Sequence, residues 1–217
     1  RNERVGVDAS CWLHKGVYSC AREICLGIPT HLFVTYCMRQ VNILIRHGIT
    51  PILVFDGDAL PMKKNEEARR HADRSAALAK AKAFEEQGDR KRAMEFYNRA
   101  VDVTPEMSYA LMLELKKARV SFIVAPFEAD SQLYYLAKKK HIDLVITEDS
   151  DLLAYGTPRV MFKWNKNPDR PGVGDEIDLS TIAGCSKLDL VNFRDDDFLN
   201  MCILSGCDYL DSMGGMG

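Results

Sequence analysis

Four short runs of apolar residues, rich in β-branched side chains, constrain the fold of this 217-residue chain more than any other feature. Each run is almost continuously apolar rather than alternating, which is typical of strands buried on both faces of a sheet. Patterns typical of helices separate the runs, and this alternation predicts a mostly parallel central sheet flanked by helices. The runs lie at residues 4–8, 51–56, 120–124 and 143–147, with a candidate fifth strand at 159–162.

The predicted helices complete an α/β fold that we expect to form a single domain. A chain of this length can bury about 70% of its unfolded surface, so it needs no disulfides or metals to fold. No apolar run approaches the roughly 18–20 residues that span a bilayer, so we expect no membrane association. The helical patterns lie at about 30–48, 62–100, 106–118, 128–140 and 195–205, and a loop is predicted at 165–175.

Acidic residues follow each of the four predicted strands. The carboxyl ends of parallel strands meet at one edge of a sheet, where open α/β folds bind their ligands. We therefore expect the acids to converge there, joined by Asp208 after the last predicted helix. The acids that follow the strands are Asp8, Asp56, Glu128, Asp130, Asp149 and Asp151.

Converging carboxylates repel one another, and few basic residues lie beside these positions in the sequence. The natural counter-charge is a hard divalent cation with oxygen ligands, and two such ions form a known device for phosphodiester hydrolysis. Taken singly, an acid after a strand is more often a turn residue or a helix cap. Asp130 and Asp149 could each cap the helix that follows.

The predicted helical segment at 62–100 is unusually basic. Residues 63–99 carry a net charge of +4, whereas the whole chain carries −2. Lys63 and Arg70 are seven residues apart and share one helix face, so we expect them to contact a phosphate, flanked by Arg69 and Arg74. The alternative is a solvated face with pairs such as Glu66–Arg70, and we favour this alternative for Lys80, Lys82, Lys91 and Arg99.

At this point the motifs resemble a known family, the 5′ structure-specific nucleases of the flap endonuclease and xeroderma pigmentosum group G type. The resemblance spans nearly the whole chain, and several stretches are similar to the exonuclease branch. Flap endonucleases usually have Glu-Ala-Glu where this chain has Glu-Ala-Asp. The motifs are Val7-Asp8, Phe55-Asp56-Gly57, Pro126-Phe127-Glu128-Ala129-Asp130, Thr147-Glu148-Asp149-Ser150-Asp151 and Gly206-Cys207-Asp208-Tyr209.

The resemblance implies a PIN-like nuclease core over 1–217, with a helical arch inserted at about 62–100. It implies two Mg²⁺ ions, for which Mn²⁺ can substitute, bound by Asp8, Asp56, Glu128, Asp130, Asp149, Asp151 and Asp208. It makes Lys63, Arg70 and Asp149 catalytic, and His14 a residue that stacks at the fork of the bound strand. The DNA-binding set is then His14, Lys63, Arg69, Arg70 and Arg74.

The implied activity is 5′→3′ exonuclease action on duplex DNA from ends, nicks or gaps, with flap cleavage as a side activity. Roles in mismatch repair and recombination, mismatch-repair partners and a nuclear location follow from the same resemblance. The family's apolar amino terminus is missing, and its helix–two-turn–helix is expected to be truncated near Gly217. Three alternatives stay open: a flap endonuclease proper, a PIN-type ribonuclease, and a non-catalytic helical scaffold that binds nucleic acid or protein.

Overall fold

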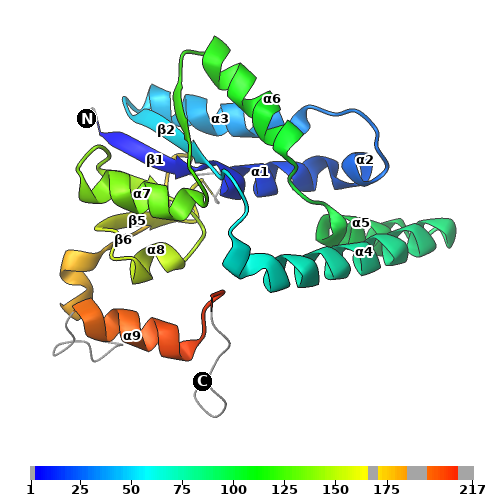
Figure 1. The fold of residues 1–217 in the computed structure, drawn as a ribbon. Helices are drawn as coiled ribbons and strands as arrows, with labels where there is room; N and C mark the ends of the chain where they lie inside the picture. The colour runs from blue at the N-terminus through cyan, green and yellow to red at the C-terminus, as the bar shows by residue number, and fades with distance from the viewer. Residues whose placement is uncertain (1–2, 166–170, 185–194, 210–217) are drawn as a thin grey trace. The chain divides into compact units, whose positions relative to one another are not determined.

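The computed structural model describes residues 3–165, 171–184 and 195–209 of the chain (Figure 1). The chain forms two compact units. The sheet unit comprises residues 1–8, 42–62 and 121–217, and the helical unit comprises 9–41 and 63–120. No helix within the described ranges is both long and apolar enough to cross a membrane. The predicted truncation of the helix–two-turn–helix falls on residues outside these ranges.

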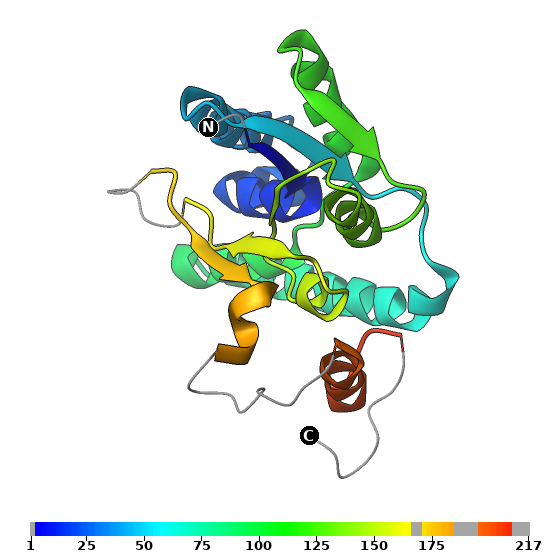
Figure 2. The same ribbon diagram turned by 90° about the vertical axis from the view of Figure 1, so that its left-hand side faces the viewer.

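A six-stranded sheet forms the centre of the sheet unit, in the order β3-β2-β1-β4-β5-β6 (Figure 1, Figure 2). The first five strands of that order run parallel, and β6 pairs antiparallel with β5. The predicted mostly parallel sheet is therefore confirmed. The strands are β1 (Arg4–Asp8), β2 (Thr50–Phe55), β3 (Ser121–Val124), β4 (Leu144–Ile146), β5 (Arg159–Phe162) and β6 (Asp175–Asp178).

Strand β6 was not predicted. Its sequence, Asp-Glu-Ile-Asp, is mostly charged, and it follows a stretch rich in proline and glycine, so it carries no apolar run. It lies at the edge of the sheet, where Lys163 Nζ bonds Asp175 Oδ2 at 2.7 Å and Arg159 Nε bonds Glu176 Oε1 at 2.7 Å. Charged residues are tolerated at such edge positions because one side of the strand faces solvent.

The helices of the sheet unit include α7, which covers the sheet in Figure 1. Its Leu133 and Leu136 pack in one apolar cluster with Val54, Val145 and Val160 of three strands. Burial of each large apolar side chain is worth about 1.5–3 kcal/mol, so this cluster fixes α7 on the sheet. The helical elements are α7 (Ala129–Lys138), α8 (Asp151–Ala154), the 3-10 helix η3 (Leu179–Gly184) and α9 (Asp195–Ser205).

The helical unit contains the α4–α5 hairpin, so the helical pattern predicted at 62–100 consists of two helices separated by a turn. Gly88 adopts a left-handed backbone (φ 80°), and the Asp89 side chain accepts a hydrogen bond from Arg92 N at 3.0 Å, which starts α5. Phe84 and Phe96 stack between the two helices, with ring centroids 5.4 Å apart. The hairpin consists of η2 (Pro61–Lys63), α4 (Lys64–Glu86) and α5 (Arg90–Ala100), and η2 begins in the sheet unit.

The other elements of the helical unit include three short helical elements before residue 30 that the sequence did not predict. The last of them, α2, is joined to the hairpin because Arg22 Nε and the buried Tyr97 hydroxyl both donate to Glu85, at 2.6 Å each. Trp12 of α1 is buried and belongs to the core. The elements are α1 (Ala9–Val17), η1 (Tyr18–Cys20), α2 (Ala21–Cys25), α3 (Leu32–Arg46, which ends in the sheet unit) and α6 (Pro105–Lys117).

Candidate metal centre

The strand order reverses beside β1, since β2 and β3 lie on one side of it and β4 and β5 on the other. Open α/β sheets bind their ligands at such a switch point, outside the carboxyl ends of the strands. Asp8 is the last residue of β1 and is only 5% exposed, and Thr147 directly follows β4. The Thr147 hydroxyl donates to Asp8 Oδ2 at 3.1 Å, so the two strands on either side of the switch point are joined at a carboxylate.

Asp56 joins the end of β2 to the start of α7. The Ala129 backbone N–H donates to Asp56 Oδ1 at 2.8 Å. Gly57 lies against the chain that precedes α7, and its N–H donates to the Phe127 carbonyl at 2.6 Å. A Cβ on Gly57 would overlap the Ala125 carbonyl oxygen and come within 2.7 Å of the Pro126 carbonyl oxygen. The Asp-Gly pair therefore lets β2 end within bonding distance of α7.

The acids after β4 are held by the same threonine. Thr147 Oγ1 accepts a hydrogen bond from Asp149 N at 3.0 Å, and Asp149 Oδ1 accepts one from Asp151 N at 2.9 Å. The alternative that Asp149 caps the following helix is wrong, because Ser150 is the N-cap of α8; the Asp149 side chain forms a turn bond instead. The same alternative is wrong for Asp130, because α7 begins at Ala129 and Asp130 lies within the helix.

Asp130 shows that the acids are brought together. Its Oδ1 is buried and has no hydrogen-bond partner among the residues that the structure describes. Burial raises the pKa of Asp130 from 3.8 to about 8, and the charges of Asp8, Asp149, Asp56 and Glu128 add to that rise. A bound cation would relieve both the burial of an unpaired oxygen and the repulsion, so this set of carboxylate oxygens fits Mg²⁺.

The two remaining acids connect to the cluster through neighbours. Asp151 is bonded to Asp149 through its backbone N–H. Asp208 is exposed and precedes Tyr209, whose hydroxyl donates to Glu128 Oε2 at 2.6 Å. All seven predicted acids therefore belong to the sheet unit, and five of them interact through their charges.

The cluster is not arranged for direct coordination by many side chains. Among the ranges that the structure covers, no group of three or more His, Cys, Asp or Glu side chains could hold a metal ion as the side chains stand. Mg²⁺ typically binds through one or two carboxylates and keeps several water ligands, so an acidic edge with room for water suits it. A cavity of about 500 Å³, beside Tyr97 in the helical unit, contains none of the seven acids.

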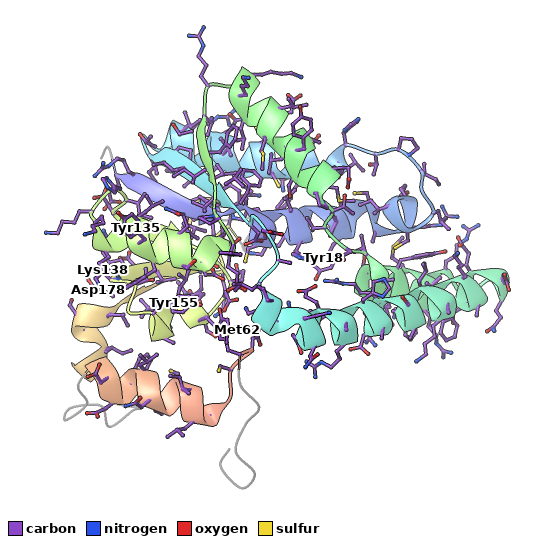
Figure 3. All side chains as sticks on the ribbon, viewed as in Figure 1. Tyr18, Met62, Tyr135, Lys138, Tyr155 and Asp178 are labelled. Atoms are coloured by element: carbon purple, nitrogen blue, oxygen red, sulfur yellow. The ribbon has the colours of Figure 1, made fainter. Side chains whose placement is uncertain are left out.

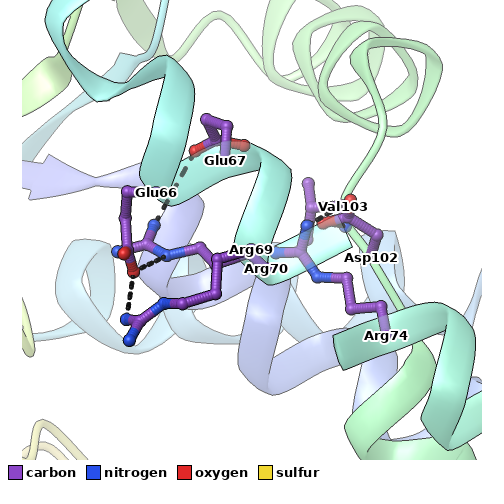
Figure 4. A network of polar contacts seen from close by, with 7 residues as sticks. All are labelled: Glu66, Glu67, Arg69, Arg70, Arg74, Asp102 and Val103. Carbon is purple, nitrogen blue, oxygen red and sulfur yellow. Dashed lines mark hydrogen bonds and ion pairs between the residues drawn. The ribbon is translucent and has the colours of Figure 1, made fainter. Parts of the chain in front are cut away.

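The predicted DNA-binding residues all belong to the helical unit. Figure 4 shows that Glu66 Oε1 accepts from Arg69 at 2.8 Å and from Arg70 at 3.1 Å, so the predicted Glu66–Arg70 pair exists. Arg74 bonds Asp102 Oδ2 at 2.7 Å. Exposed ion pairs contribute little free energy, so a phosphate can compete for the exposed Arg69 and Arg70. Lys63 ends η2, and the half-buried His14 lies on α1.

Three polar residues of the site were not predicted as site residues: Thr147, Tyr155 and Tyr209. Thr147 and Tyr209 lie inside recognised motifs, but a neutral side chain next to an acid gives no charge signal of its own. Tyr155 lies outside the motifs and bonds Tyr209 through the two hydroxyls, which are 2.9 Å apart. Only the fold brings residue 155 next to residue 209.

Two family models match the chain: the XPG N-terminal domain over residues 1–77 and the XPG I-region over residues 119–208. The chain belongs to the XPG family. Within that family it is a homologue of exonuclease 1. It is 46% identical to exonuclease 1 of Oryza sativa subsp. japonica over 217 residues, which are 100% of the chain and 26% of that protein.

Other XPG relatives give a similar result. The chain is 43% identical to exonuclease 1 of Xenopus laevis, with 100% of the chain and 29% of that protein covered. It is 39% identical to exodeoxyribonuclease 1 of Schizosaccharomyces pombe, with 98% of the chain and 36% of that protein covered. The chain therefore spans about a quarter to a third of the length of these relatives.

Solved structures of the XPG family share the fold. The catalytic core of Rad2 in complex with DNA substrate matches with a TM-score of 0.68 and 22% identity, over 100% of the chain and 58% of that structure. Flap endonuclease-1 from Methanococcus jannaschii matches with a TM-score of 0.66 and 24% identity, over 100% of the chain and 68% of that structure. The Holliday junction-resolving enzyme GEN1, in complex with product DNA and Mg²⁺, matches with a TM-score of 0.61 and 21% identity. The match covers 100% of the chain and 42% of that structure.

Proposed function

We propose that the chain is the catalytic core of a metal-dependent 5′→3′ exodeoxyribonuclease. It hydrolyses phosphodiester bonds of duplex DNA from ends, nicks or gaps, with 5′ flap cleavage as a side activity. The observation that carries this proposal is the buried, unpartnered Asp130 oxygen among four other carboxylates at the switch point of the sheet. The family and the exonuclease 1 relatives support the choice of DNA as substrate.

The acids of the sheet unit hold two Mg²⁺ ions in this proposal, with Mn²⁺ as a substitute. Bound cations supply stabilisation for the charge that builds on the phosphate during hydrolysis. The chain orients the acids itself, because Thr147 fixes Asp8 and Ala129 N–H fixes Asp56. The metal-binding residues in this proposal are Asp8, Asp56, Glu128, Asp130, Asp149, Asp151 and Asp208.

The bases of the helical unit act on the substrate. Lys63 and Arg70 stabilise the scissile phosphate, and Arg70 offers it two parallel N–H donors. Arg69 and Arg74 bind the DNA backbone, and His14 stacks at the fork of the strands. These roles come from the family resemblance and from the exposure of Arg69 and Arg70, whose ion pairs with Glu66 open when a phosphate replaces the carboxylate.

The wider context is proposed from the relatives. The relatives named above are eukaryotic, and both the plant protein and the frog protein are exonuclease 1. We infer a nuclear location, a role in mismatch repair and recombination, and mismatch-repair proteins as partners. In this proposal residues 1–217 belong to one nuclease core, with a helical arch at about 62–100.

The test is digestion of a blunt or 5′-recessed duplex with Mg²⁺. The proposal predicts mononucleotides released from the 5′ end, and loss of at least about 100-fold in rate for Asp149→Asn. Glu148→Gln is the matched control, because Glu148 accepts a hydrogen bond from the backbone N–H of Lys163 at 3.0 Å, and glutamine accepts the same bond. Equal digestion in excess chelator contradicts the proposal.

The product distinguishes the alternatives. Release of an intact 5′ flap without mononucleotides indicates a flap endonuclease, and faster cleavage of RNA than DNA indicates a PIN-type ribonuclease. A non-catalytic scaffold shows neither cleavage nor a rise in melting temperature with millimolar Mg²⁺, since only a ligand of the native state raises apparent stability.

A further inference from the structure

A chain of hydroxyl groups connects three distant segments of the sheet unit at the acidic cluster. The Tyr209 hydroxyl donates to Glu128 Oε2 at 2.6 Å, and the Tyr155 and Tyr209 hydroxyl oxygens are 2.9 Å apart. Tyr155 directly follows α8, Glu128 directly precedes α7, and Tyr209 lies beyond α9. These tyrosines are absent from the site residues that the sequence predicts.

We propose that Tyr209 and Tyr155 are positioning residues for the metal centre. They orient the Glu128 carboxylate and hold the segment that carries Asp208. The inference rests on the proposed function, because it requires that the acidic cluster binds Mg²⁺.

The direction of the hydrogen bonds follows from counting protons. A tyrosine hydroxyl has one proton, and Tyr209 gives its proton to Glu128, since a carboxylate only accepts. Tyr155 must then donate to Tyr209, although the distance alone allows either direction. Tyr155 therefore reaches Glu128 through Tyr209, and each bond strengthens the next.

Packing fixes Tyr155, the first residue of the hydroxyl chain. The Tyr155 ring contacts the Tyr134 ring of α7, with centroids 6.2 Å apart and planes inclined at 43°. Glu128 directly precedes α7, so the same helix supports both ends of the hydroxyl chain. Figure 3 labels Tyr155 at the end of α8.

The position of Asp208 follows from that of Tyr209. Adjacent residues share a peptide plane, so a fixed Tyr209 side chain limits where the Asp208 backbone can lie. Metal ligands have to be held within about 0.5 Å of their productive position, and their hydrogen-bonded neighbours usually do this. One bond from Tyr209 thus serves two of the proposed ligands.

The experiment measures Mg²⁺ affinity of the 217-residue chain by calorimetry, together with its melting temperature in chelator. Tyr209→Phe removes the hydroxyl but keeps the ring, and we expect about tenfold weaker Mg²⁺ binding. Tyr155→Phe is expected to weaken binding less. Tyr135→Phe is the matched control, because Tyr135 lies on α7 with 51% of its surface exposed (Figure 3), and it should bind Mg²⁺ like the wild type.

The double variant gives the sharpest result. Because the effect of Tyr155 passes through its bond to Tyr209 in this proposal, Tyr155→Phe/Tyr209→Phe should bind Mg²⁺ as weakly as Tyr209→Phe alone. Losses that multiply in the double variant overturn the inference. A Tyr209→Phe variant that binds Mg²⁺ as tightly as the wild type also overturns the inference. This holds even if its melting temperature in chelator is lower, since the tyrosine would then only support the fold. A wild-type chain that binds no Mg²⁺ overturns the proposed metal centre itself and the inference with it.

Discussion

Asp130 is the residue on which the electrostatics of the site depend. It combines a buried oxygen that has no hydrogen-bond partner with the charges of four neighbouring acids. An unpaired buried polar atom costs free energy, and the neighbouring negative charges add to that cost. The residue therefore opposes folding in the absence of a cation, which makes its removal informative.

Asp130→Asn should raise the melting temperature in chelator and abolish the response to Mg²⁺. Asparagine has nearly the same shape but no charge, and its amide can donate to the surrounding carboxylates. A ligand at 100 times its Kd stabilises the native state by about 2.7 kcal/mol, and the variant should lack this gain. Thermal melts with and without Mg²⁺ measure both effects.

The control for this variant is Glu114→Gln, which removes an acid from an exposed pair with Lys117 in the helical unit. It should keep the full response to Mg²⁺. An Asp130→Asn chain that Mg²⁺ stabilises as much as the wild type would show that Asp130 is no part of a metal centre.

The pH dependence of stability gives a second prediction for the same residue. The pKa of Asp130 is about 8 in the folded chain and 3.8 as its ordinary value, so the folded state binds the extra proton between these limits. Stability in chelator should therefore fall as pH rises from about 4 to about 8. Urea unfolding at several pH values measures the free energy of unfolding, and its decrease with pH should be smaller in Asp130→Asn. The same slope in both chains would contradict the assignment.

At the scale of elements, the contact between the end of β2 and the start of α7 leaves no room for a side chain at Gly57. Gly57→Ala should destabilise the chain by about 1–3 kcal/mol, because the new Cβ meets the carbonyl oxygens of Ala125 and Pro126, which belong to the backbone and cannot rotate away. It should also weaken Mg²⁺ binding, since Asp56 precedes Gly57. Urea unfolding and calorimetry test both effects.

Gly184→Ala is the matched control, because a Cβ on Gly184 meets no atom of the described part of the chain within 4 Å. It should unfold like the wild type. Equal stability of the Gly57 and Gly184 variants would mean that β2 and α7 do not approach as closely as the structure shows.

The α4–α5 hairpin provides a prediction about the substrate. Lys63→Ala and Arg70→Ala should each slow DNA cleavage by about 100-fold, since each removes a donor to the charged phosphate, while Mg²⁺ binding stays unchanged. Lys91→Ala should cleave normally, because Lys91 is exposed on α5 and we assign it to the solvated face. Cleavage rates and Mg²⁺ affinities measured side by side test this separation, and equal effects at Lys63 and Lys91 would refute it.

The sequence predicts long or strongly apolar elements better than short ones. Strands β1 to β5 and the α4–α5 hairpin were predicted because each carries an apolar run or a long helical pattern broken at Gly88. The five-residue α2 and the four-residue α8 are too short to show a helical period. Packing in the folded chain, such as the bond from Arg22 to Glu85, decides their structure.

For the whole molecule, the approach of Asp8, Asp56, Glu128, Asp130 and Asp149 was predictable because parallel strand ends meet at one edge whatever the loops do. The residues that orient the acids were not, because Thr147 reaches Asp8 and Tyr155 reaches Tyr209 only after the strands and helices have assembled. The basic segment at 63–99 was predictable from composition, but its pairing of Arg74 with Asp102 depends on the folded helical unit.

Crystals of the chain grown with Mn²⁺ test the central claim most directly, through the anomalous signal of the metal. We predict anomalous peaks at the carboxyl ends of β1 and β4, with oxygens of Asp8, Asp130 or Asp149 at coordinating distances of about 2.0–2.6 Å. Peaks only elsewhere on the surface, or none at saturating Mn²⁺, would contradict the metal centre and with it the nuclease.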